Sequence, residues 1–197
     1  MLRLYNNIDL NSKLEHNRPV IKIIIPKIAH IEHTNIPKLP GLDKPLIFRG
    51  IKVSETDYYI EIFTGLYVGS NPTCNLLDNL NIDIIITLGS EYSLCSTTKF
   101  RTVIDLLDND NGNIRLICPD IINTMYNMDK AIRTNKHRIF VHCDRGISRS
   151  PSYIILYLMR TYELEFNKIM KMFLEAVNVV LIYSKFAKEL RNVIIEK

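Results

Sequence analysis

Short runs of hydrophobic residues, separated by helical segments, dominate the chain from Tyr58 onward. The runs rich in β-branched and aromatic residues are residues 58–63, 65–70, 82–89, 101–107 and 138–143. From residue 82 on, these runs are nearly continuous in Ile, Val and Leu, which is typical of strands buried on both faces. The helical segments are residues 71–80, 119–135, 150–161, 165–177 and 183–195. This alternation predicts an α/β fold in which helices flank a central, mostly parallel sheet.

The first 55 residues follow a different pattern. Five of the eight prolines lie between residues 19 and 45, where they interrupt short apolar runs, so this stretch cannot form a long helix or a central strand. It carries nine Lys or Arg against five Asp or Glu, whereas the rest of the chain is balanced. We interpret residues 1–55 as a basic N-terminal arm and residues 56–197 as the globular domain. The arm is either a partly disordered tail or a segment that docks on the domain, on a partner subunit or on an acidic surface.

Composition is that of an ordinary globular protein, with 47% hydrophobic and 23% charged residues. The longest apolar runs fall short of the roughly 20 residues of a membrane span, and the first residues lack a secretory signal pattern. We therefore expect no membrane partner and a cytoplasmic, reducing location. Four cysteines without zinc-site or disulfide-scaffold spacing predict reduced thiols. A net charge of +4 is too small to indicate nucleic-acid binding, and the abundance of Ile, Asn and Lys indicates an AT-rich genome, such as that of a virus or parasite.

The last predicted strand runs directly into a loop that carries candidate chemistry, and an apolar helix follows it. The loop reads His142-Cys143-Asp144-Arg145-Gly146-Ile147-Ser148-Arg149-Ser150-Pro151. A strand, a tight loop and a helix N-terminus form an anion site, because backbone N–H groups converge there and the helix dipole favours negative charge. The same field favours the thiolate of Cys143, which is the nucleophilic form of cysteine. Arg149 lies where the loop turns back, and its planar guanidinium can hold two phosphate oxygens at once.

The other loop positions suit the same purpose. Gly146 lets the backbone approach a ligand closely, and Pro151 fits the first turn of a helix. We predict Cys143 and Arg149 as catalytic residues, with His142 bracing the loop and Ser150 capping the helix or donating to the thiolate. The predicted phosphate-binding residues are Asp144, Arg145, Gly146, Ile147, Ser148 and Arg149. The spacing His-Cys-x5-Arg alone arises by chance in about half a percent of chains of this composition, so an inert buried cysteine beside a solvated arginine is the weaker interpretation.

The segment HCDRGISRSPSYIILYLM resembles the phosphate loop and following helix of the dual-specificity protein phosphatases. Residues 66–70 resemble the family's early strand and turn, residues 86–89 its second strand, and residues 120–121 the start of the helix after the acid loop. The resemblance covers residues 58–197 and leaves the arm unmatched. It implies a protein-tyrosine-phosphatase-like fold and a mechanism that needs neither metal nor cofactor. In that mechanism Cys143 forms a cysteinyl-phosphate intermediate, which water then hydrolyses.

The resemblance also implies a general acid on the loop after the predicted strand 101–107. The family pattern places this acid at Asp108, with Asp110 as the alternative, while Asp105 still belongs to the strand. The sequence departs from the pattern in two ways. Asp105 stands where proline is common, and Cys143 lies 35 positions after Asp108, a wider spacing than is usual in the family. A plain solvated turn remains the other interpretation of these carboxylates.

The substrate implied by the resemblance is a phosphoprotein carrying phosphotyrosine, phosphoserine or phosphothreonine. The catalytic region is short and shows no match to the additional phosphotyrosine-binding loop of the larger tyrosine-specific enzymes. Three alternatives stay open: a phosphoinositide phosphatase, an RNA 5′-triphosphatase of the same superfamily, and a poorly active phosphate-binding scaffold. We also expect the N-terminal arm to act in substrate docking or in a homodimer.

Overall fold

The centre of the molecule is a six-stranded sheet, seen in a computed structural model that describes residues 35–55, 57–89, 100–104, 106 and 116–196. Its strands are β2 (Arg49–Lys52), β3 (Tyr58–Phe63), β4 (Leu66–Gly69), β5 (Ile84–Leu88), β6 (Phe100–Ile104) and β7 (Ile139–His142). Their order is β2-β3-β4-β7-β5-β6, with β4, β7, β5 and β6 parallel and the β2–β3 and β3–β4 pairs antiparallel. The predicted α/β class with a mostly parallel sheet is confirmed.

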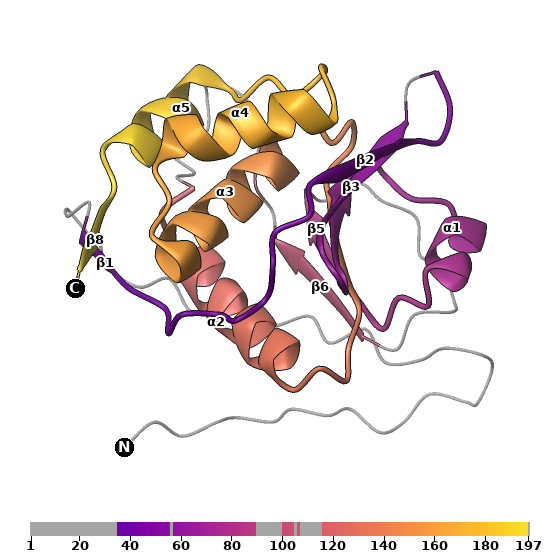
Figure 1. The fold of residues 1–197 in the computed structure, drawn as a ribbon, viewed down its shortest axis with the longest axis horizontal. Helices are drawn as coiled ribbons and strands as arrows, with labels where there is room; N and C mark the ends of the chain where they lie inside the picture. Colours follow the sequence, from indigo (N-terminus) through magenta and orange to yellow (C-terminus); the bar gives the residue numbers. More distant parts are fainter. Residues whose placement is uncertain (1–34, 56, 90–99, 105, 107–115, 197) are drawn as a thin grey trace, which may run out of the picture.

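Helices cover both faces of this sheet (Figure 1). One face carries α2 (Pro119–Arg133) and α3 (Arg149–Tyr162), with α4 (Phe166–Ala176) and α5 (Ser184–Arg191) packed on α3. The short α1 (Cys74–Asn79) lies over the other face, where its Leu77 joins a smaller core. Successive residues of β5 point to opposite faces of the sheet: Ile86 packs in the larger hydrophobic core and Ile85 in the smaller one. The unbroken apolar runs of the sequence follow from this burial on two sides.

The predicted helices are confirmed in position, with one correction at the C-terminal end. The predicted helix 183–195 ends at Arg191, and the chain continues as β8 (Ile194–Glu196). This strand pairs in parallel with β1 (Asn35–Pro37), far away in the sequence. A local pattern could not show this pairing, because the partner strand comes from the opposite end of the described chain.

Residues 35–48, which we call the strap, bind along α3 and so join the last part of the predicted arm to the domain (Figure 1). Ile36 and Leu39 are buried in the main core, at 3% and 2% exposure. The backbone N–H of Leu39 donates to the Arg160 carbonyl at 3.0 Å, and Arg160 Nε donates to the Pro37 carbonyl at 2.8 Å. The strap therefore contributes core side chains as well as backbone contacts. A role for the arm in dimerisation remains a prediction.

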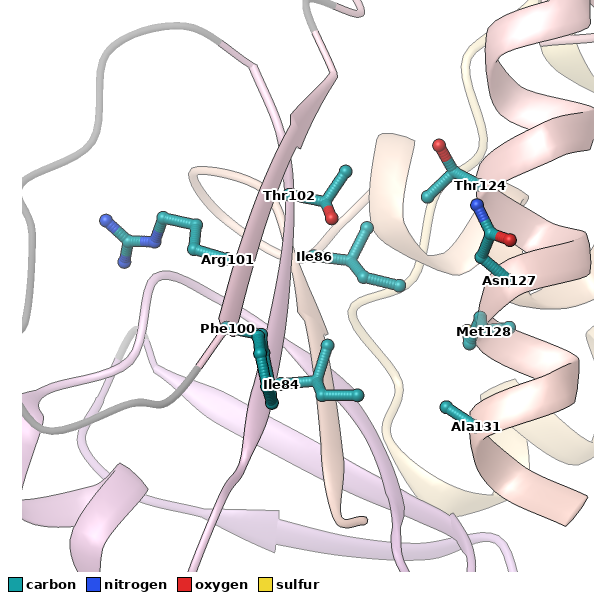
Figure 2. A pocket seen from close by; sticks show the side chains of 9 residues that line it. All are labelled: Ile84, Ile86, Phe100, Arg101, Thr102, Thr124, Asn127, Met128 and Ala131. Carbon is teal, nitrogen blue, oxygen red and sulfur yellow. The ribbon is translucent and has the colours of Figure 1, made fainter. Parts of the chain in front are cut away.

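The packing of α2 against the edge of the sheet leaves a small cavity of ≈ 180 Å³. Figure 2 shows Ile84, Ile86 and Met128 pointing into this space, whereas Arg101 points away from it, on the other side of β6. Arg101 is buried, and this burial lowers the pKa of its guanidinium. The edge of the sheet thus places a cation on the side away from α2.

No helix in the described part of the chain is long and apolar enough to cross a membrane. Cys118 and Cys143 are free thiols, whereas Cys74 is disulfide-bonded, in contrast to the reduced thiols expected from the cysteine spacing.

Candidate active site

The loop between β7 and α3 leaves the middle of the sheet, since β7 lies between β4 and β5. It can follow its tight path because two glycines meet there. Gly146 has a φ of +72°, and a Cβ at this position would lie 2.5 Å from the backbone of Gly69 and Ser70. A Cβ on Gly69 would lie 2.3 Å from the Tyr58 carbonyl oxygen. The loop therefore rests directly on the end of β4, in a conformation that favours glycine.

Three other segments hold the loop by hydrogen bonds. Four such bonds are formed: Asn71 N–H donates to the Asp144 carbonyl at 2.9 Å, Tyr58 Oη–H to the Gly146 carbonyl at 2.7 Å, Leu181 N–H to the Ile147 carbonyl at 3.1 Å, and Tyr183 N–H to Ser148 Oγ at 3.0 Å. In a trans peptide the carbonyl and the next N–H point in opposite directions. Because three loop carbonyls bind partners outside the loop, the N–H groups that follow them face its interior. This is the arrangement that binds an anion.

Cys143 lies at the start of this loop and is almost fully buried. Its Sγ is 3.3 Å from Ser150 Oγ, which is in turn 3.1 Å from the Gly69 carbonyl oxygen. Ser150 has only one hydroxyl proton to donate. With a Cys143 thiol, the S–H can donate to Ser150 while Ser150 donates to Gly69. With a thiolate, the Ser150 hydroxyl can turn to the sulfur instead and stabilise its charge.

His142, at the end of β7, is completely buried. Its Nδ1 is 3.3 Å from the Cys143 carbonyl oxygen, which can only accept, so Nδ1 carries the proton. Nε2 then accepts from the Thr87 hydroxyl at 2.9 Å. Burial lowers the pKa of His142 to about 4, and the charges of Arg101 and Arg149 act in the same direction. The imidazole is therefore neutral at physiological pH and ties the loop to β5.

A cavity of ≈ 660 Å³ opens over the loop. It is lined by Cys143, by five of the six predicted phosphate-binding residues and by residues 181–184. The guanidinium of Arg149 is on this lining and donates from Nη1 to the Leu106 carbonyl at 3.4 Å. Asp108 and Asp110, the two candidates for the general acid, lie outside the described residues. Through the bond between Arg149 and Leu106, the chain contacts the catalytic loop two residues before Asp108.

Sequence reasoning missed Tyr58, Gly69 and residues 181–184 as parts of this site. Burial raises the pKa of Tyr58, and the charge of Cys143 raises it further, so the hydroxyl stays protonated and donates to the loop. The Gly-Ser turn after β4 is a signal that could have indicated a close backbone approach. Residues 181–184 carry no motif, and only the fold brings them to the cavity. Across the described ranges, no three His, Cys, Asp or Glu side chains are grouped as a metal site.

Comparison with known proteins gives one family. The model of the dual specificity phosphatase catalytic domain matches residues 66–195. Human dual specificity protein phosphatase 5 is 30% identical over 106 residues, a match that spans 52% of this chain and only 27% of the human protein. Dual specificity protein phosphatase 1B of Arabidopsis thaliana is 28% identical over 116 residues, spanning 57% of this chain and 67% of the plant protein.

Solved structures agree on the fold. The crystal structure of human DUSP28 has a TM-score of 0.55 at 19% identity, covering 65% of this chain and 90% of that one. A mouse putative dual specificity phosphatase complexed with zinc tungstate has a TM-score of 0.60 at 17% identity, covering 72% of this chain and 88% of that one.

Proposed function

The chain belongs to the dual specificity phosphatase family by its catalytic domain, and we propose that it hydrolyses phosphotyrosine, phosphoserine and phosphothreonine on proteins. One observation carries the proposal. Cys143 and Arg149 line the same cavity, at the two ends of the loop that leads into the N-terminus of α3. This arrangement supports binding of a phosphate group with its phosphorus facing the sulfur.

In the proposed first step, Cys143 Sγ attacks phosphorus, an S–P bond forms and the bond from phosphorus to the leaving oxygen breaks. Asp108 donates the proton that the leaving oxygen takes up. Arg149 and the loop N–H groups stabilise the charge on the equatorial oxygens. In the second step, water attacks phosphorus, Asp108 takes a proton from it, and the thiolate leaves. Donation from Ser150 to the sulfur supports that departure.

The test begins with a small aryl phosphate, which reports chemistry without substrate recognition. We expect the purified protein to hydrolyse it and Cys143→Ser to abolish turnover. Arg149→Lys should lower kcat by about 10² to 10³, because an ammonium cannot bind two oxygens in the geometry of the guanidinium. A protein that binds phosphate or vanadate but does not turn over the aryl phosphate would be a scaffold.

The substrate class is then decided by comparing the rates at which the enzyme hydrolyses different phosphorylated substrates. Phosphopeptides carrying each of the three phosphoresidues, a phosphoinositide in mixed micelles and a 5′-triphosphate RNA are compared by kcat/KM. The proposal expects the phosphopeptides to be preferred. A higher kcat/KM for either of the other two substrates would assign the chain to that activity instead.

A further inference from the structure

A second cavity adjoins the catalytic one. This flanking groove, of ≈ 1050 Å³, lies between three parts of the chain: residues of β2 and the segment after it (50, 52, 54, 55, 57 and 58), the catalytic loop, and the end of α4 with the residues after it (174–179). Three residues line both cavities: Asp144, Arg145 and Ile147. A substrate bound with its phosphate over Cys143 therefore has the flanking groove directly beside it.

The walls of the flanking groove are fixed in place. Gly50 of β2 packs so closely on the end of α4 that a Cβ there would lie 2.1 Å from the Ala176 carbonyl oxygen. Beyond α4, the chain is tied to the catalytic loop by the bond from Leu181 N–H to the Ile147 carbonyl. Residues 174–179 line the groove and residues 181–184 line the catalytic cavity, so one segment of the chain passes from one cavity to the other. A wall shared by two cavities suits an extended ligand that occupies both.

The two cavities differ in charge. The charged side chains on the catalytic cavity are two arginines and one aspartate. The flanking groove is lined by four acidic residues against two basic ones, and its acidic residues are Glu55, Asp57, Asp144 and Glu175. Apolar side chains lie among them, and two of these, Leu174 and Val179, are about half exposed at 48% and 45%. Complementary charge steers and orients a partner more than it adds affinity.

We propose that the flanking groove binds the segment of a phosphoprotein substrate next to its phosphorylated residue, and that it selects segments with basic and apolar side chains. The inference rests on the proposed function, since it places the phosphate in the catalytic cavity. The positive cavity takes the phosphate, the negative groove takes Lys or Arg, and the exposed apolar side chains pack against an aliphatic neighbour. Glu55 and Glu175 are specificity-determining residues that lie outside the catalytic machinery.

The experiment uses the full chain and three peptides that share a central phosphotyrosine. On both flanks the peptides carry Arg and Leu, Glu and Leu, or Ser and Ala. We expect kcat/KM for the Arg peptide to exceed that for the Glu peptide by about tenfold, mainly through KM, because a few exposed charge pairs contribute modestly each. This ratio should shrink as salt is raised.

The double variant Glu55→Lys/Glu175→Lys should erase or reverse the preference and leave kcat/KM for a small aryl phosphate unchanged. Asp43→Lys/Asp78→Lys is the matched control: it makes the same change in net charge at two exposed sites outside the groove, with Asp43 near Tyr162 at the other end of α3, and should keep the preference. Equal turnover of all three peptides by the wild type, or a preference that survives the double variant, would overturn the role of the groove alone. Turnover of the aryl phosphate without turnover of any peptide would overturn the protein-phosphatase function, and the role of the groove with it.

Discussion

The buried imidazole of His142 makes the stability of this domain depend on pH. His142 is completely buried, and its pKa falls to about 4 in the folded chain, compared with about 6.5 in an unfolded one. Above pH 6.5 the imidazole is neutral in both states, and the contribution to stability is fully present. As the pH falls below 6.5 the unfolded chain binds a proton that the folded chain rejects. Stability is therefore lost until the pH reaches about 4.

The size of this loss follows from the shift. A difference of about 2.5 pKa units corresponds to about 3 kcal/mol of unfolding free energy, most of it lost between pH 6.5 and pH 4.5. This is a large share of the roughly 5 to 15 kcal/mol that stabilises a typical domain. Protonation would also add a donor at Nε2, where the Thr87 hydroxyl now donates, so the folded loop cannot simply accept the charge.

Urea unfolding followed by far-UV circular dichroism measures this effect; the chain has no tryptophan to serve as a fluorescence probe. The free energy of unfolding is compared at about pH 7 and pH 4.5 for the wild type, His142→Asn and His137→Asn. We expect His142→Asn to be less stable at pH 7 but to lose about 2 to 3 kcal/mol less than the wild type on acidification. His137→Asn, the same substitution just before β7 at a partly exposed position, is the control for the change of residue itself.

An NMR titration of the His142 ring covers the case in which the variant does not fold. The ring should show no protonation in the wild type above about pH 5. A midpoint near the ordinary value of about 6.5 would refute the reasoning, because the imidazole would then be accessible to water and its neutral form would not be required by burial.

Three further outcomes are expected. Asp108→Asn should lower kcat by about 10² to 10⁴ on phosphotyrosine and much less on an activated phenol ester, measured by steady-state kinetics; if Asp110→Asn shows this pattern instead, the acid lies two residues further on. Iodoacetate should modify Cys143 faster than Cys118, whose pKa is raised by burial, and phosphate should protect Cys143, as peptide mapping would show. Deleting residues 1–48 should cost about 3 to 6 kcal/mol by urea unfolding, because the two buried side chains of the strap are lost.

The hydrophobic pattern along the chain predicted the central sheet and the helices around it. The apolar runs and helical segments gave the sheet and its helices, because burial on two faces leaves a continuous hydrophobic signature. The pairing of β1 with β8 and the strap could not be read in this way. They join opposite ends of the described chain, and the prolines of the strap suppress the usual signs of regular structure.

The residues of the candidate site also fall into two groups: those that the sequence identified and those that only the fold brings to the site. The loop sequence identified Cys143 and Arg149 together with the residues between them, because a strand, a loop and a helix N-terminus are contiguous in the chain. Tyr58 and residues 181–184 reach the site only through tertiary packing, and they sit in segments with no motif of their own.

These distant contributions determine what the loop can do. An anion site depends on N–H groups that already point inward before the phosphate arrives, since reorienting them during the reaction would cost free energy. Four hydrogen bonds from segments outside the loop hold its backbone or the Ser148 side chain, and the buried ring of His142 ties the Cys143 carbonyl to β5. The motif therefore supplies the reacting groups, while residues up to 88 positions away in the sequence supply their orientation, as for Tyr58 and Gly146. Replacing Tyr58 by Phe should accordingly lower kcat on the aryl phosphate while Cys143 and Arg149 are intact, because the Gly146 carbonyl would lose its donor.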